Sequence, residues 1–553
     1  MLRWAGIAVV ALSATASIAA EPPHPATVAD IRAADISARD KALSDDYFQG
    51  RGPGTEAGER AAQWVADEMK RIGLTPGNDG SYFQTVPAVS ITMDPQKSSL
   101  SVAGPDGVKP LKLADEAMWC TPRYASADVR VDNAPLVFVG YGVNALEEHW
   151  NDYAGLDVKG KVVVVLINDP GFLTHDETMF KGRAMTYYGR WTYKYEEAAR
   201  QGAAGVIIVH ETEPAAYGWQ VVRTSFSGAQ SYLEAPDANQ SRIALKAWVT
   251  EQAAQALFRR AGLDYEVLKI AANRRGFKPI AMKGLTVSAV MHSTIAHTTT
   301  RNVVGVIRGS KHPDDYILYT AHWDHLGIKP ELPGPDKIYN GAIDNAMGVS
   351  TVLEIGEAFA KAPKPPERSV AIIAWTLEEQ GLLGSEYFAH HPLWPLSHIV
   401  AGVNRDGGAP QGVAHDMVVV GNGASELEDV LAKELKKQDR TISPDPEPEK
   451  GTFYRSDHIS LAKVGVPMLY PKDGSDLVVG GKAAAAAVRD DYTAHRYHQV
   501  TDEFDPKWDL SGLVADTKVL YGLGQDLANS EAWPNWYKGN EFRATRDATL
   551  PGR

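Results

Sequence analysis

The chain has 553 residues, of which 44% are hydrophobic and 9% aromatic, which is typical of a folded globular protein and not of a disordered one. At roughly 150 residues per domain, this length predicts two to four domains. The net charge of −13 argues against general binding of nucleic acid or of anionic membranes, because both need basic surfaces.

The first 20 residues have the layout of a secretory signal peptide. Arg3 precedes a short apolar stretch, and small residues precede Glu21. We expect cleavage after Ala19 or Ala20 and a secreted or periplasmic protein. The apolar part is shorter than the roughly 20 residues that cross a bilayer, so we expect no stable membrane insertion.

Residues 21–128 are predicted to form the N-terminal part of the main domain. Thr55 is a suitable cap for a helix whose apolar residues recur at helical spacing, and Gly73 is a suitable stop. Residues 91–108 alternate weakly and indicate sheet. Cys120 is the only cysteine, so the chain permits no internal disulfide and no thiolate metal cluster.

Residues 129–285 are predicted to form a smaller, β-rich α/β domain inserted into the main one. The segments PLVFVGYG, KVVVVLIND and GAAGVIIVHE indicate strands, and a helix is expected near Tyr195–Gln201. GYGVNA matches a dinucleotide-binding fingerprint. However, the segment after it is a poor helix to receive a pyrophosphate, and no ribose-binding acid follows at the expected distance. We therefore expect no nucleotide site.

Residues 286–530 are predicted to form the rest of the main domain, and 531–553 a surface tail. Strands and helices alternate, which favours a doubly wound, mostly parallel sheet with helices on both faces, an α/β fold. The expected strands are Asn302–Arg308, Tyr316–Ala321, Val370–Trp375 and Val464–Tyr470, and the expected helices are Val349–Ala360, Leu427–Leu435 with Ser425 as its cap, and Leu510–Leu527.

Two adjacent acids, Glu378 and Glu379, follow the predicted buried strand Val370–Trp375. In open α/β sheets, ligands bind beyond the carboxyl ends of the strands. Neighbouring residues of an extended segment point to opposite sides, so the two carboxylates are suited to two tasks, one as a metal ligand and one as a proton carrier. For the pair taken alone, the alternative is the solvated first turn of a helix.

Further ionisable residues lie where strands are predicted to end or helices to begin. His322 follows a strand, Asp406 follows the apolar segment IVAGVN, Asp344 immediately precedes a helix, and His498 lies in RYHQVTDEF. Asp324 is placed to hold the second ring nitrogen of His322, as carboxylates commonly do for histidine ligands.

Together these residues offer two imidazoles and three carboxylates without sulfur: His322, Asp344, Glu379, Asp406 and His498. Such a donor set suits two divalent cations bridged by one carboxylate, and zinc is the commonest such metal in an exported hydrolase. We therefore predict two zinc ions per chain.

The segments TAHWDHLG, NGAIDNAMGV, LEEQGLLGS, NRDG, SDH and YHQVTDE, in this order, resemble the successive motifs of M28 metallopeptidases, which are co-catalytic zinc hydrolases of the aminopeptidase type. The insertion, with FVGYGV, LDVKGKVVVV and AARQGAAGVIIV, resembles a protease-associated (PA) domain. The resemblance covers the chain from about Asp40 to the insertion and from about Leu285 to Asn529.

The resemblance implies a role for each motif residue. Asp344 would bridge both metals, His322 and Asp406 would complete one site, and Glu379 and His498 the other. Glu378 would be the general base. A cis peptide between Asp344 and Asn345 is also implied.

Other residues near these motifs are ambiguous. Arg405 stands where the family usually has an apolar residue, so it either forms an ion pair or reaches the substrate. Tyr454 is a candidate for polarising the substrate carbonyl, although its register is shifted. Asp457 and His458 are expected to be a structural or supporting pair. The motifs favour His322 and His498 as ligands over their neighbours His325 and His495.

The resulting hypothesis is an exported dizinc aminopeptidase that acts on peptides and binds no nucleic acid. A carboxypeptidase or dipeptidase of the same fold would instead use a cation such as Arg405 to bind a terminal carboxylate. A glutaminyl cyclase-like acyltransferase would use one zinc ion, and a binding protein would keep the fold without catalysis.

Overall fold

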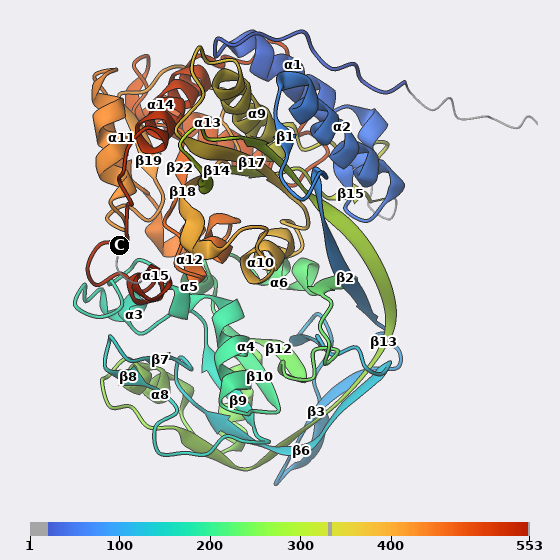
Figure 1. Ribbon diagram of the computed structural model, residues 1–553. Helices are drawn as coiled ribbons and strands as arrows, with labels where there is room; N and C mark the ends of the chain where they lie inside the picture. Colours follow the sequence, from blue (N-terminus) through green and yellow to red (C-terminus); the bar gives the residue numbers. More distant parts are fainter. Residues whose placement is uncertain (1–19, 330–333, 551–553) are drawn as a thin grey trace, which may run out of the picture.

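The computed structural model describes residues 20–329 and 334–550, so residues 1–19 of the predicted signal peptide lie outside the described part. Figure 1 shows two bodies, connected along one side by the 28-residue strand β13 (Ile280–Ile307). No helix among the described residues combines the length and apolar character needed to cross a membrane.

The main body contains a mostly parallel sheet in the order β21-β18-β14-β17-β13. Its strands are β14 (His312–His322), β17 (Arg368–Trp375), β18 (Ile399–Asn404), β21 (Met468–Leu469) and the end of β13. β14 pairs parallel with β17 and β18, and β18 with β21, whereas β13 pairs antiparallel with β17. Every residue of β17 and β18 is buried, as their continuous apolar runs predict.

Helices cover both faces of this sheet (Figure 1), as predicted. Apolar side chains of five helices join one core cluster with residues of β14 and β17. These helices are α1 (Ala33–Leu43), α2 (Glu56–Ile72), α9 (Met347–Ala360), α11 (Leu427–Lys436) and α14 (Ser511–Ala528). On the opposite face, Phe388 of α10 (Leu383–His390) and Leu461 of α12 (His458–Lys463) pack against the strands.

The second body is the inserted domain. It continues the sheet from β13 through β6 (Asp128–Phe138), β9 (Val162–Leu166), β10 (Gly205–His210), β12 (Leu245–Thr250) and β5 (Ala117–Cys120). β3 (Ser99–Gly104) and β4 (Gly107–Pro110) extend it beside β13. Because β3, β4 and β5 precede residue 129, the second body begins earlier in the chain than predicted. Its helices include α4 (Trp191–Arg200), α7 (Glu251–Arg260) and α8 (Tyr265–Ala272).

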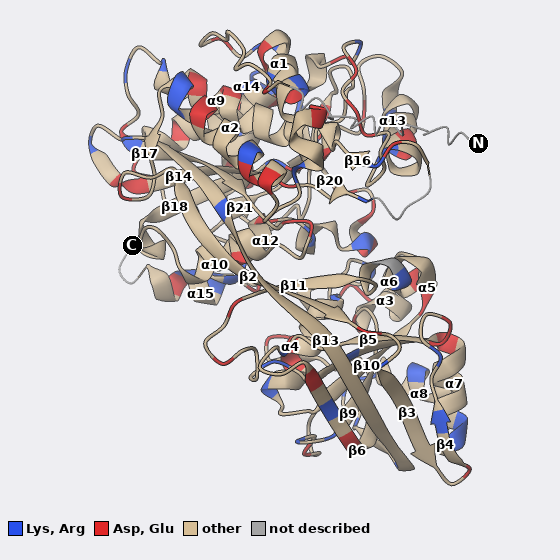
Figure 2. Cartoon of the chain, turned by 90° about the vertical axis from the view of Figure 1, so that its right-hand side faces the viewer, with Lys and Arg blue, Asp and Glu red and all other residues tan. Residues whose placement is uncertain are grey.

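Two long antiparallel strands connect the bodies, as Figure 2 shows from the side. β2 (Phe83–Met93) pairs with β13 from Phe83 opposite Val303 to Met93 opposite Ser293. A short strand of the insertion, β11 (Ala229–Leu233), pairs with the other edge of β2. The strand expected at Asn302–Arg308 is therefore only the last part of a strand that runs through both bodies.

Several local predictions are confirmed and others are wrong. Thr55 caps α2 by accepting a hydrogen bond from the Gly58 N–H at 3.1 Å, and Gly73 ends the helix with φ 104°. Ser425 does not cap α11, because the helix begins after Glu426 without a side-chain cap. The strand expected at Val464–Tyr470 is reduced to β21, because the turn that follows α12 occupies Val464 and Gly465.

The C-terminal segment is not a surface tail. Trp536 is fully buried and donates its indole N–H to the Gly465 carbonyl at 2.9 Å. Arg546, in α15 (Arg543–Thr549), is also buried and donates to the carbonyls of Ile399 and Val400 at the start of β18. The segment therefore closes the edge of the main body.

Candidate metal centre

Parallel pairing brings three candidate residues to one edge of the sheet. In the β14–β17 pair His322 lies opposite Trp375, and in the β14–β18 pair Thr320 lies opposite Asn404. Glu378 and Asp406 therefore follow strands that end level with His322. This is the edge at which open α/β sheets bind ligands.

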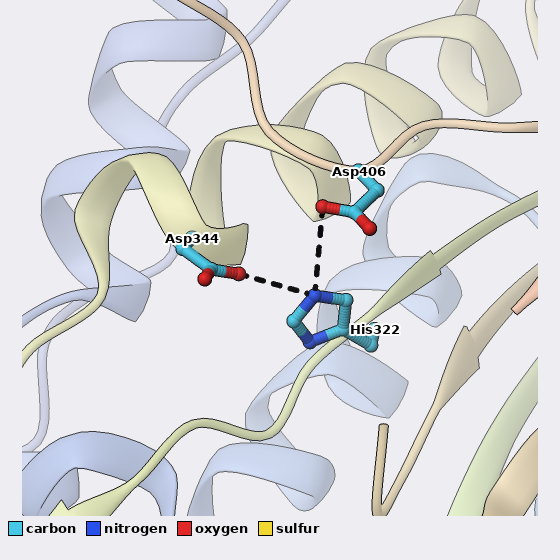
Figure 3. Close-up of side chains that lie close together, drawn as sticks. All are labelled: His322, Asp344 and Asp406. Atoms are coloured by element: carbon cyan, nitrogen blue, oxygen red, sulfur yellow. Dashed lines mark ion pairs between the residues drawn. The ribbon is translucent and has the colours of Figure 1, made fainter. Parts of the chain in front are cut away.

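Asp344 reaches the same place from the turn of π-helix Ala342–Ala346, just before α9. Its Oδ1 lies 3.2 Å from Nε2 of His322, and Oδ1 of Asp406 lies 3.9 Å from the same nitrogen. Figure 3 shows the three side chains pointing toward one another. They form one group whose ligand atoms all lie within 4.8 Å. The cis peptide between Asp344 and Asn345 is present, as the resemblance implies.

A second group shares Asp344. Nε2 of His498 lies 3.2 Å from Asp344 Oδ2 and 3.1 Å from Glu379 Oε2. His325 also approaches: its Nδ1 lies 2.5 Å from Glu379 Oε1, and His325, Asp344 and Glu379 form a metal-sized group. Two imidazoles therefore face this side of Asp344, where the motifs indicate one.

The clustered charges shift the pKa values in a consistent direction. Burial alone would lower the pKa of His322, but Glu378, Asp344 and Asp406 raise it well above its usual range. Burial alone would raise the pKa of Glu379, but the imidazoles of His498 and His325 hold it at about 2. The Glu379 carboxylate is therefore ionised, as a metal ligand must be.

Glu378 differs from its neighbour. Burial, together with the like charges of Asp406 and Glu379, raises its pKa well above the usual range although His322 opposes this. Its Oε2 lies 4.0 Å from His322 Nε2, and it belongs to neither metal-sized group. One acid of the pair thus belongs to a metal-sized group, and the other lies beside the groups and belongs to neither.

Asp324 supports the site in a different way from the one predicted. Nδ1 of His322 lies 3.1 Å from the main-chain oxygen of Asp324, whereas the nearest carboxylate oxygen lies 3.9 Å away. The Asp324 carboxylate instead accepts the Glu378 N–H at 3.2 Å. Burial raises the pKa of this carboxyl to about 7. Asp324 therefore connects the strand-end loops of His322 and Glu378.

Arg51 is a supporting residue that the sequence did not reveal. It is 1% exposed and donates hydrogen bonds to the main-chain oxygens of Trp323 at 2.7 Å, Gly341 at 2.8 Å and Asn340. Asp344's main-chain oxygen lies 3.5 Å from the same guanidinium. One side chain of the N-terminal segment therefore holds the loop after His322 and the loop before Asp344, two members of the same metal-sized group.

Asp502 supports the same turn from the C-terminal side. Its two carboxylate oxygens accept the N–H groups of Ile343 at 3.1 Å and Asp344 at 3.0 Å. No periodic pattern marks Asp502, because its partners lie about 160 residues away in the sequence.

The two candidate substrate contacts lie elsewhere. Arg405 is 1% exposed and forms an ion pair with Asp473, so the ion-pair alternative is the one that the structure contains. Tyr454 is buried at the interface with the insertion, where its hydroxyl donates to Glu541 at 2.9 Å and its ring lies 6.2 Å from that of Tyr187. Neither side chain is free to touch a substrate.

Tyr470 contacts Asp406, and His458 packs against Tyr470. The Tyr470 hydroxyl donates to Asp406 Oδ2 at 3.3 Å, and the His458 ring lies 4.5 Å from the Tyr470 ring. Burial lowers the pKa of His458 to about 3 and raises that of Asp457 to about 8. His458 is therefore a neutral packing residue, and Asp457 a buried neutral acid.

Tyr497 is the exposed tyrosine of the site. It precedes His498, its ring stacks on that imidazole at 4.0 Å, and it is 48% exposed. His495, the other histidine that the motifs disfavour, pairs with Asp491 on α13 (Gly481–His495) and is exposed.

The residues present fit a pair of metal ions. Two metal-sized groups share the Asp344 carboxylate, and their donors are imidazole nitrogens and carboxylate oxygens, which suit zinc. Nε2 of His325 is buried without a hydrogen-bond partner, which is unfavourable unless a ligand or water satisfies it.

The fold and the site together define an α/β protein with a candidate metal centre and an inserted domain. Residues 302–521 match the model of Peptidase family M28, and residues 132–242 match that of the PA domain. The main domain therefore contains an M28 peptidase region, and the insertion contains a PA domain.

Known proteins support this assignment. Aminopeptidase NAALADL1 of Mus musculus is 32% identical over 138 residues, 24% of this chain and 17% of that protein. The Glutamate carboxypeptidase 2 homolog of Caenorhabditis elegans is 24% identical over 397 residues, 61% of this chain and 46% of that protein. The chain thus spans less than half the length of these relatives.

A solved structure has the same fold. The aminopeptidase from Aneurinibacillus sp. strain AM-1 aligns with a TM-score of 0.50 at 18% identity, covering 91% of this chain and 95% of that one. At this identity, the likeness concerns the fold alone.

Proposed function

We propose that the protein is an exported zinc-dependent peptidase, an aminopeptidase that removes N-terminal residues from peptides with the help of two zinc ions. The observation that carries the proposal is the sharing of Asp344 by two metal-sized groups, with Glu378 beside them in neither group. Aminopeptidases among the relatives support this choice.

In this proposal, His322 and Asp406 hold one zinc ion, Glu379 and His498 hold the other, and Asp344 holds both. When bound, such ions polarise the scissile carbonyl and lower the pKa of water. Glu378 accepts the proton of the attacking water and delivers it to the leaving amine. The raised pKa of Glu378 suits a group that must both take and release a proton near neutral pH.

The test combines metal removal with one substitution. We expect a chelator to abolish hydrolysis of aminoacyl anilides, zinc to restore it, and Glu378→Gln to lower kcat by about 100-fold or more while zinc still binds. Glu386→Gln is the matched control, because Glu386 lies on α10 with 34% of its side chain exposed and pairs with Arg242. Normal turnover by Glu378→Gln would show that another group carries the proton.

The alternatives make different predictions for the same preparation. A carboxypeptidase cleaves N-blocked peptides and fails on C-amidated ones, whereas an aminopeptidase does the opposite. A dipeptidase needs both termini free and fails on either kind. Arg405 gives the former no support, since it is buried and paired. A glutaminyl cyclase-like acyltransferase would bind one zinc ion per chain, and a binding protein would show no turnover.

A further inference from the structure

Lys472 lies at the Asp406 end of the candidate centre. It is the second residue of β22 (Pro471–Lys472), which pairs antiparallel with β19 (Asp416–Val419). Its Nζ donates to the main-chain oxygen of Asp406 and lies 3.8 Å from Asp406 Oδ1. The ammonium also lies 4.9 Å from the centre of the Tyr470 ring. Two independent contacts therefore fix this cation beside a candidate metal ligand.

The accessibility of Lys472 distinguishes it from the other cations near the site. Arg51 and Arg405 are each 1% exposed, and their guanidinium groups are engaged by main-chain oxygens and by Asp473. The Lys472 side chain is 32% exposed. An ammonium has three N–H donors, and Lys472 uses one on the Asp406 main chain, so donors remain for a bound molecule.

A free space adjoins the ammonium. Gly407 follows Asp406, and a Cβ built on it would meet only the Lys472 Nζ, at 3.6 Å, whereas a Cβ on Gly408 would lie 2.9 Å from Met347 Cγ. The space beside the ammonium is therefore at Gly407, next to the candidate ligand. A group of a substrate held at Asp406 is able to reach the ammonium there.

The charge of Lys472 selects what binds there. A substrate ammonium placed at this end would meet a like charge, whereas a carboxylate would gain a charge-assisted hydrogen bond. We propose that Lys472 forms a carboxylate subsite, so that the preferred peptides carry a carboxylate next to the scissile bond. The carboxylate is either an acidic side chain or the chain terminus. This inference rests on the proposed peptidase function.

The test uses the zinc-loaded full chain and two matched pairs of peptides. One pair differs by Glu or Gln beside the scissile bond, and the other by a free or an amidated C-terminus. For wild type we expect kcat/KM to favour the carboxylate member of one pair by about tenfold, and the pair that shows the preference identifies the source of the carboxylate. This preference should fall as salt is raised, because the subsite is partly exposed.

Variants then assign the preference to the lysine. We expect Lys472→Arg to keep most of it, Lys472→Met to bring the ratio near one, and Lys472→Glu to invert it. Lys463→Met is the matched control, because Lys463 is similarly exposed but pairs with Glu196 of the insertion at 3.6 Å. Each ratio compares two substrates on one preparation, so it is independent of a general loss of turnover.

The outcomes separate the two proposals. Hydrolysis without any carboxylate preference, or a preference that survives Lys472→Met, overturns the subsite and leaves the peptidase intact. If Lys472→Met does not fold, the substrate preference of Lys472→Glu and the salt dependence of the wild-type preference test the subsite instead. No hydrolysis of any of the peptides would overturn the proposed function itself.

Discussion

Replacement of Arg51 by methionine tests how the metal loops are held. The guanidinium lies in the N-terminal segment, yet its acceptors include the main-chain oxygens of Trp323, Asn340 and Gly341, more than 270 residues along the chain. Methionine has a comparable apolar stem and no donor, so Arg51→Met leaves the oxygens of Trp323 and Asn340 without this partner, whereas that of Gly341 still accepts the Ala346 N–H at 3.2 Å.

The magnitude follows from the number of acceptors. A buried polar group that loses its partner costs about 1–3 kcal/mol, so two would cost about 2–6 kcal/mol if nothing relaxed. Single substitutions rarely exceed about 4–5 kcal/mol, because the structure adjusts. We therefore expect a loss of about 4 kcal/mol in the free energy of unfolding of the main domain. Loss of a residue that orients ligands typically weakens metal binding about 10–100-fold, and we expect the same here.

Urea unfolding followed by tryptophan fluorescence measures the first effect, and competition with a zinc-binding dye measures the second. Arg60→Met is the control, because Arg60 lies on the neighbouring helix α2, pairs with the exposed Glu56, and donates to one main-chain oxygen, that of Tyr47. We expect it to change stability by less than about 1 kcal/mol. Arg51→Met with the unfolding midpoint and zinc affinity of wild type would refute the reasoning.

Two further predictions concern the histidines and the acid stability. We expect His498→Ala to lower bound zinc from two ions to one, and His325→Ala to keep both ions with about tenfold weaker affinity, because His325 contacts Glu379 through Nδ1. Metal analysis after dialysis measures this; loss of an ion in His325→Ala but not in His498→Ala would make His325 the ligand. Burial alone would raise the pKa of Glu68, but hydrogen bonds from Arg71 and His24 and the charge of Arg39 lower it from 4.5 to about 2. Because the pKa of Glu68 is lower in the folded protein, its ionised carboxylate stabilises the fold by about 3 kcal/mol above pH 4.5, and this contribution is lost as pH falls toward 2. Unfolding curves of Glu68→Gln should lack that part of the pH dependence.

The sequence predicts the strands that hold the site because their signal is local. Val370–Trp375 and IVAGVN are continuous apolar runs, and both form fully buried strands at the expected places. Once parallel pairing is assumed, the residues after them must lie at one edge. The positions of Glu378 and Asp406 follow from this geometry, and their convergence with His322 needs no further information.

The supporting residues could not be predicted in this way. Arg51 lies in a short 3₁₀ segment, and its partners come from loops close to His322 and Asp344. Lys472 lies in β22, a strand of only two residues, which has no detectable period. Such contacts depend on how loops distant in sequence meet, and a single sequence contains no periodic signal for that.

The insertion enters and leaves the main body without altering the sheet edge that carries the candidate metal centre. β2 and β13 pair over eleven successive positions, and beyond them the Asp94 N–H still donates to the His292 carbonyl at 2.8 Å, so the two crossings lie side by side. An insertion whose ends are adjacent replaces a hairpin and leaves the neighbouring strands in register.

The insertion also returns to the main body close to the site. The Met185 N–H donates to the Pro448 carbonyl at 3.2 Å, and Glu447, next to it, lies 3.9 Å from Arg489 of α13, the helix that ends just before His498. Besides its connection along β13, the PA domain thus contacts the loop at residue 448 of the main body. Because the same loop contacts α13, it connects the inserted domain to the helix that leads to His498.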